Sequence, residues 1–284
     1  WQGAFYNLAK LAATGGLVYL AGFLIEIYGQ VNAWMIIMGC CGVIMILLGL
    51  YHIKMLPSDQ NAHSGQVTSA KETWEALKDV IITFFQKKYI VWYIAFIILY
   101  RFAEGLVMKI VPLFLKADVA AGGLGLSEQE IGLYYGSFGA AAFVLGSFLS
   151  GYFISHFGLR KTLFTLCCVF NIPFVVYPLL AFYQPDSALL IGGAITFEYF
   201  GYGFGFVGLS LFMMQQVAPG KHQMAHYAFA SGIMNLGVMI PGMISGYLSD
   251  MLGYDVFFVI VLFAAIPAFI ITKLVPFTYP DEKK

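Results

Sequence analysis

Charged residues are scarce in this chain, and their scarcity excludes an ordinary water-soluble protein. Asp, Glu, Lys and Arg make up only 11% of the 284 residues, and 15 basic residues balance 15 acidic ones. Soluble globular proteins carry about 25% charged residues, which their surfaces need. Because neither sign of charge is in excess, the composition also gives no reason to expect nucleic acid as a partner.

Cysteine is also rare, and its spacing excludes the usual cysteine-based sites. The four cysteines form two adjacent pairs at positions 40–41 and 167–168. Neither pair has a zinc or redox spacing, so we interpret them as small, reduced packing residues. His222 and His226 are four positions apart, but no third ligand lies near them in the sequence. We therefore expect no metal, no cofactor and no catalytic group.

Hydrophobic residues make up 60% of the chain and gather in long blocks. Each block has about twenty residues, the length of a helix that spans a bilayer, and none shows the short alternation of a membrane β-barrel. Helices are therefore the expected spanning form. The sequence predicts an all-α membrane protein with about eight transmembrane helices, at residues 4–25, 33–53, 89–115, 131–154, 163–182, 188–214, 227–248 and 257–275.

The polar stretch 54–88 separates the first two predicted helices from the other six. Its second part carries Trp74, Leu77 and Ile81 at helical spacing, which predicts an amphipathic helix at the membrane surface. In the predicted topology, eleven Lys or Arg residues lie on the side of this stretch, and Lys116 alone lies on the other. Because short cytoplasmic loops carry the excess of basic residues, we expect a multi-pass protein whose C-terminus is cytoplasmic.

An internal repeat predicts that the chain comes from a protein with two similar halves. Residues 22–29 and 246–253 align without gaps at an offset of 224 positions, so the first two helices correspond to the last two. We interpret 1–53 as the last two helices of an N-terminal half, 54–88 as a linker, and 89–284 as a complete six-helix C-terminal half. The chain is then a fragment of a six-plus-six, pseudo-symmetric parent, an architecture typical of secondary transporters.

Ionisable residues inside apolar blocks are the main candidates for function, because such residues are costly in a membrane. Arg101 and Glu104 are three positions apart and share a helix face, with Lys109 further along the same block. Glu198 lies at a similar depth in another block, where a buried glutamate can hold a proton. Lys10 can approach from the other half. Two interpretations stay open: a structural ion pair, or residues for substrate binding and proton coupling.

Two tyrosines and one asparagine extend this candidate site. Tyr199 follows Glu198 directly and Tyr202 lies four positions after it, and aromatic faces with polar tips suit sugar rings. Asn235 lies in the block 227–248. The alternatives are aromatic packing for the tyrosines and an interhelical hydrogen bond for Asn235.

The stretch 151–161 resembles the signature loop of the major facilitator superfamily, glycine-x-x-x-aspartate-arginine-x-glycine-arginine-lysine. Ser155 stands in place of the aspartate and His156 in place of the first arginine. The resemblance implies a cytoplasmic gating loop and the major-facilitator-type helical bundle. Four of its positions are retained in this sequence: Gly151, Gly158, Arg160 and Lys161.

Within that superfamily the chain resembles the AmpG-like muropeptide permeases, as the last eight of twelve helices. The resemblance is carried by residues 100–104, Lys109, Pro112, 225–228 and 241–247. It implies proton-driven symport of an amino sugar or muropeptide through a bacterial inner membrane, by a protein that acts as a monomer in the lipid bilayer. The alternatives are a permease of the same superfamily for another sugar or peptide, and a polytopic membrane enzyme acting on a lipid-linked substrate.

Overall fold

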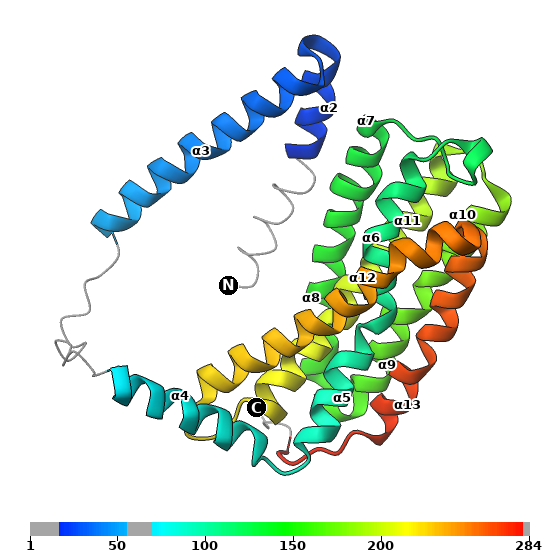
Figure 1. Cartoon of the computed structure of the whole chain (residues 1–284). Helices are drawn as coiled ribbons and strands as arrows, with labels where there is room; N and C mark the ends of the chain where they lie inside the picture. The colour runs from blue at the N-terminus through cyan, green and yellow to red at the C-terminus, as the bar shows by residue number, and fades with distance from the viewer. Residues whose placement is uncertain (1–16, 56–69, 281–284) are drawn as a thin grey trace.

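The computed structural model of the chain describes residues 17–55 and 70–280, and every regular element in these ranges is helical (Figure 1). The expected all-α class is therefore confirmed. By length and composition, four helical stretches in the described ranges are long and apolar enough to cross a membrane: Gln30–Ile53, Glu128–Phe157, Leu159–Tyr183 and Gln223–Leu274. The last of these, with 52 residues, is about twice the length that one crossing needs.

Helices correspond to each predicted block, although several blocks are divided. The first two are α2 (Leu17–Tyr28) and α3 (Gln30–Met55), and the start of the first block lies outside the described residues. The third block is α5 (Ile90–Tyr100) and α6 (Phe102–Lys116), followed by a short 3₁₀ turn, η2 (Val119–Ala121). The fourth block joins α7 (Glu128–Ile131), the π-helix η3 (Gly132–Phe138) and α8 (Gly139–Phe157).

The remaining blocks form the second part of the bundle. The fifth is α9 (Leu159–Asn171), the 3₁₀ turn η4 (Ile172–Val175) and α10 (Val176–Tyr183), where Pro173 accounts for the irregular turn. The sixth is α11 (Ala188–Phe212) with the π-helix η5 (Met213–Val217). The last two blocks are covered by α12 (Gln223–Ala264), which contains the seventh block and the start of the eighth, and by α13 (Ile266–Leu274), which ends the eighth. Inside α12 the backbone leaves the helical conformation at Gly253, with φ 76° and ψ 161°, so two helices meet there.

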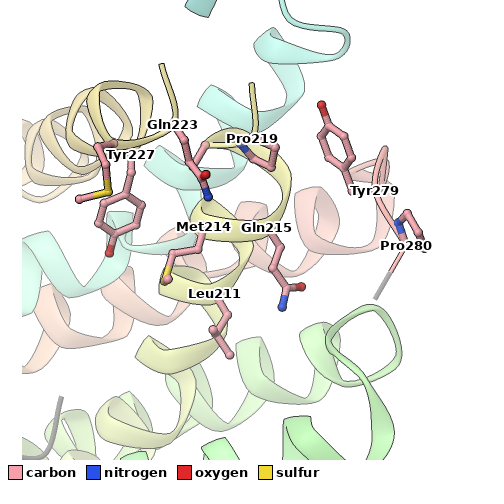
Figure 2. Close-up of a pocket in the computed structure, with 10 residues that line it drawn as sticks. Leu211, Met214, Gln215, Pro219, Gln223, Tyr227, Tyr279 and Pro280 are labelled. Atoms are coloured by element: carbon pink, nitrogen blue, oxygen red, sulfur yellow. The ribbon is translucent and has the colours of Figure 1, made fainter. Parts of the chain in front are cut away.

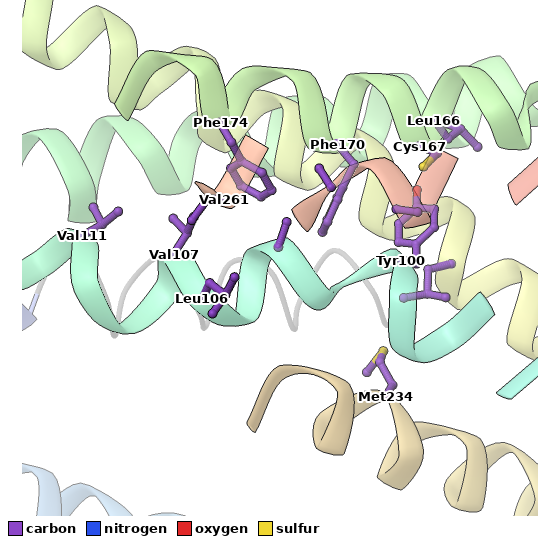
Figure 3. Packing of buried hydrophobic residues seen from close by; sticks show 14 of the residues in the cluster. Tyr100, Leu106, Val107, Val111, Leu166, Cys167, Phe170, Phe174, Met234 and Val261 are labelled. Carbon is purple, nitrogen blue, oxygen red and sulfur yellow. The ribbon is translucent and has the colours of Figure 1, made fainter. Parts of the chain in front are cut away.

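Close packing of α8, α9 and α11 depends on glycine at the contacts. A Cβ atom at Gly203 would collide with the backbone carbonyl of Phe143 on α8, and one at Gly205 would collide with Phe170 on α9. Large buried side chains fill the space between the helices. Figure 3 shows Val107, Phe174 and Val261 meeting between α6, η4 and α12. The glycines thus bring α11 close enough for its polar side chains to reach its neighbours.

The first helices and the linker helix lie outside this bundle. Helix α2 packs against α7 and η3, whereas α3 packs chiefly against α2 and stands away from the bundle (Figure 1). The stretch after α3 contains the helix α4 (Ala70–Phe85). Trp74 is 66% exposed and Leu77 is 50% exposed on this helix.

Helix α4 is fastened to the start of α12. The Asp79 carboxylate lies 2.7 Å from Nε2 of His222 and 3.0 Å from Nζ of Lys221. The hydrogen bond from His222, followed by that from Lys221, lowers the pKa of Asp79 below its ordinary value. Lys87, just after α4, donates a hydrogen bond to the carbonyl oxygen of Pro219, and burial lowers the pKa of this lysine.

Candidate functional site

A buried ion pair lies where the third predicted helix is broken. Nε and Nη2 of Arg101 donate to the two carboxylate oxygens of Glu104, each at 2.5 Å, and the side chains are only 7% and 6% exposed. Helix α5 ends at Tyr100, and Arg101 takes φ −106° and ψ 5° before α6 begins. The break creates a new helix N-terminus, and Glu104 lies in its first turn, where the helix dipole favours a carboxylate.

Aromatic groups surround the arginine of this pair. The centre of the Arg101 guanidinium lies 5.2 Å from the ring centre of Phe206, a distance typical of a cation–π contact. The hydroxyl of Tyr202 lies 3.5 Å from Nη2 of Arg101. Because α11 carries both aromatic residues, the ion pair at the junction of α5 and α6 is held directly against α11.

A second buried carboxylate, Glu198, lies on α11 and is 6% exposed. The hydroxyl of Tyr177 on α10 donates a hydrogen bond to its Oε2 at 3.0 Å. The ring of Tyr177 stacks on that of Phe258, with 5.4 Å between the ring centres, and this contact fixes the hydroxyl's position. Within residues 17–55 and 70–280, no Lys, Arg or His nitrogen lies within 4.0 Å of the Glu198 carboxylate.

The two carboxylates line one small cavity. Its volume is about 30 Å³, which is enough for a water molecule. The rings of Tyr135 and Tyr199 meet edge to face at 4.9 Å, and that of Tyr199 continues to Tyr202 at 6.2 Å. The cavity therefore combines two acids with several phenol groups in an apolar surrounding. Its lining consists of Glu104, Val107, Met108, Tyr135, Phe174, Tyr177, Glu198, Tyr199 and Tyr202.

The structure thus brings five of the predicted site residues together, places two elsewhere and does not describe the eighth. Arg101, Glu104, Glu198, Tyr199 and Tyr202 surround or adjoin the cavity. The other three are Lys109, which is exposed on α6, Asn235, which is exposed on α12, and Lys10, which lies outside the described residues. The functional roles of all eight stay predictions.

The predicted gating loop is the junction of α8 and α9. Gly151 lies in α8, and Gly158 joins the two helices with φ 82° and ψ 148°. Arg160 and Lys161 are exposed in the first turn of α9, and the Arg160 guanidinium lies 5.9 Å from the ring centre of Phe277. Ser155, which stands at the aspartate position of the signature, donates its hydroxyl to the carbonyl oxygen of Tyr152 at 2.8 Å.

Two tyrosines of the cavity were not predicted from the sequence. Tyr177 donates a hydrogen bond to Glu198, and Tyr135 lines the cavity with its ring against that of Tyr199. Little in the pattern distinguishes them from the rest of the chain's 18 tyrosines. The one usable signal is the position of Tyr177 beside Pro178 in the middle of a block, away from the membrane surface where tyrosines usually lie.

A larger cavity, of about 670 Å³, lies at the C-terminal end of α11 (Figure 2). It is formed by η5, the start of α12 and the residues after α13. Gln215 projects there, and its Oε1 atom is buried without a hydrogen-bond partner among the described residues. The acids of the small cavity take no part in its lining, which consists of Leu211, Met214, Gln215, Ala218, Pro219, Gln223, Met224, Tyr227, Tyr279 and Pro280.

Comparison with known proteins gives one family and several relatives. The family model described as Major Facilitator Superfamily matches residues 96–284. A candidate transporter named AmpG 2 of Rickettsia felis is 28% identical over 189 residues, which cover 64% of this chain and 43% of that protein. The candidate transporter AmpG 1 of Rickettsia bellii is 22% identical over 279 residues, covering 94% and 62% respectively. The chain therefore spans between 43% and 62% of the length of these relatives.

Proposed function

The chain belongs to the Major Facilitator Superfamily, and we propose that its protein is a secondary transporter that moves a small solute by alternating access. The family and the transporter names of the relatives point to a transporter and not to an enzyme. The buried acids between the helices support the proposal, because ionisable residues inside a membrane bundle usually mark a solute or ion pathway.

The transporter is coupled to protons through Glu198. This carboxylate is buried, accepts a hydrogen bond from the Tyr177 hydroxyl, and has no cation beside it in the described part of the chain. A lone negative charge in such surroundings is costly, and a proton removes it. Glu104, by contrast, is neutralised by Arg101. The difference between the surroundings of these two acids is the observation that carries the proposal. Glu104 is paired with Arg101, whereas Glu198 is left to exchange a proton.

The solute is an amino sugar or a muropeptide, imported through a bacterial inner membrane. The relatives named AmpG and the resemblance of residues 100–104, 225–228 and 241–247 support this choice. Several tyrosines beside the acids suit a sugar ring. Another sugar or a peptide, carried by a permease of the same superfamily, is the alternative. The protein acts as a monomer. Its C-terminus is cytoplasmic, an orientation that the excess of basic residues on one side supports.

The division into halves is part of the proposal. Residues 1–53 close an N-terminal half, 54–88 form the linker, and 89–284 form the C-terminal half. The backbone supports it: Gly29 and Gly253, which occupy the same position in the sequence repeat, have φ 77° and φ 76°. Both glycines follow the helix whose sequence is repeated, so the two segments share a local structure as well as a pattern.

Uptake of radiolabelled N-acetylglucosamine–anhydromuramyl peptide by cells producing the natural protein tests the proposal. Uptake should collapse when a protonophore is added, and Glu198→Gln should abolish it. Glu128→Gln is the matched control, because Glu128 is exposed in a surface ion pair with Lys116 that contributes little. Uptake that resists the protonophore would remove proton coupling. A folded, inserted protein without uptake would remove the muropeptide and leave another sugar or peptide as the solute.

A further inference from the structure

The six residues after α13, 275–280, form a strap across the end of the bundle. The strap is tied to η5 by Gln216, whose side chain is 1% exposed. Oε1 of Gln216 accepts hydrogen bonds from the backbone N–H groups of Thr278 and Tyr279, at 2.8 and 3.0 Å. Nε2 of the same side chain donates to the carbonyl oxygen of Tyr279 at 2.9 Å. One buried amide therefore satisfies three backbone groups of the strap.

Other elements hold the strap as well. The hydroxyls of Tyr93 on α5 and Thr278 are 2.5 Å apart. The ring of Phe277 meets that of Phe212, at the end of α11, edge to face at 5.5 Å. Figure 2 shows Tyr279 and Pro280 of the strap beside η5. Together these contacts fix the position of Phe277 relative to α5 and α11.

The other side of Phe277 reaches the predicted gating loop. The Arg160 guanidinium, in the first turn of α9, lies 5.9 Å from the Phe277 ring centre, within the range of a cation–π contact. Arg160 follows Gly158, whose φ of 82° makes the junction between α8 and α9 a sharp turn. The chain of contacts thus runs from Gln216 through the strap to the α8–α9 junction.

We propose that Phe277 and Gln216 are positioning residues for the gating loop: the strap, fastened by Gln216, holds the α8–α9 junction in place through the contact between Phe277 and Arg160. The contact itself can be tested without transport. Its meaning for gating rests on the proposed transporter function.

The test is hydrogen–deuterium exchange of the α8–α9 junction in the natural protein, in detergent or nanodiscs. Phe277→Leu keeps an apolar side chain but removes the ring, so exchange at residues 155–163 should become about two- to fivefold faster, the factor for an exposed cation–π contact. Phe277→Trp should restore slow exchange, because its ring also binds a cation. Tyr279→Leu is the matched control, an aromatic residue of the strap without a ring contact to Arg160.

Two further variants separate positioning from simple packing. Gln216→Leu should speed exchange at the junction although Gln216 does not contact it. In an Arg160→Gln background, Phe277→Leu should add nothing, because the contact is already lost. Equal effects of Phe277→Leu with and without Arg160, or unchanged exchange in Gln216→Leu, would overturn the proposal. Uptake assays on the same variants test the proposed transport function independently of the exchange measurement. If the exchange results hold but no muropeptide is taken up, the transport function is refuted and the strap contact stands.

Discussion

Removing the carboxylate of the buried ion pair is the sharpest test of the site. Glu104→Gln keeps the shape of the side chain but leaves the Arg101 guanidinium without its counter-charge. In the natural protein both side chains are less than 8% exposed and share two hydrogen bonds of 2.5 Å. An uncompensated guanidinium charge at such a buried place needs water or another polar partner, and the surrounding apolar bundle offers few polar groups.

The size of the effect follows from what remains around Arg101. Breaking a buried pair by removing one partner costs about 3–5 kcal/mol. Arg101 keeps the Phe206 ring at 5.2 Å and the Tyr202 hydroxyl at 3.5 Å, and the adjacent cavity of about 30 Å³ has room for one water. These contacts offset part of the loss. We therefore expect Glu104→Gln to lower the free energy of unfolding by about 3 kcal/mol, at the low end of that range.

Equilibrium unfolding in mixed detergent micelles, followed by circular dichroism, measures this change. The double variant Arg101→Met with Glu104→Gln removes both charges and should recover to within about 1 kcal/mol of the natural protein, because apolar replacement of a buried pair is often neutral. An unchanged stability in Glu104→Gln, or a double variant as unstable as the single one, would refute the reasoning. Uptake then decides the role: a structural pair allows the double variant to transport, whereas a substrate or coupling role does not.

Two further predictions concern other contacts of the bundle. Gly203→Leu should destabilise the protein by about 1–3 kcal/mol or more, because the leucine side chain would collide with the Phe143 backbone. The control is Gly193→Leu, on the same helix, where the space around the glycine is open. Thermal unfolding measures both variants. Asp79 is stabilised as a carboxylate by His222, so its contribution is present above its ordinary pKa of about 3.9 and is lost as the pH falls through its lowered pKa. Asp79→Asn should therefore lower Tm at pH 7, and the difference from the natural protein should shrink as the pH falls through the lowered pKa of Asp79.

Much of the fold follows from the sequence, because an apolar block of about twenty residues in a bilayer has few alternatives to a helix. The divisions inside the blocks do not follow from it. The break at Arg101 has no proline or glycine beside it, and it depends on the pairing of Arg101 with Glu104 and the contacts with α11. The π-helix Gly132–Phe138 was not predicted either, because its residue pattern does not distinguish a π-helical turn from an α-helical one.

The site was predictable where it carries charge, because an acid or arginine stands out in an apolar block. Glu198 and the Arg101–Glu104 pair are of this kind. Lys109 also stood out, but it lies five positions after Glu104, which is about 140° around the helix, and it is exposed. Tyr177 was missed for the opposite reason. Its role depends on reaching a residue 21 positions away on another helix, and no local pattern records that distance.

The repeat offers a last prediction, in which sequence and backbone agree. Gly253, with φ 76° and ψ 161°, lies in a region of backbone conformation open almost only to glycine, so Gly253→Ala should cost about 1–3 kcal/mol. Gly246→Ala is the matched control: Gly246 belongs to the same repeat element, is helical and has open space around it, so alanine there should be neutral or stabilising. Gly29, the repeat equivalent of Gly253 with φ 77°, should respond to alanine like Gly253. Thermal unfolding of the three variants measures this. If Gly29→Ala and Gly253→Ala change the stability no more than Gly246→Ala does, the two turns do not require glycine. The repeat would then be a sequence similarity without a shared structural requirement.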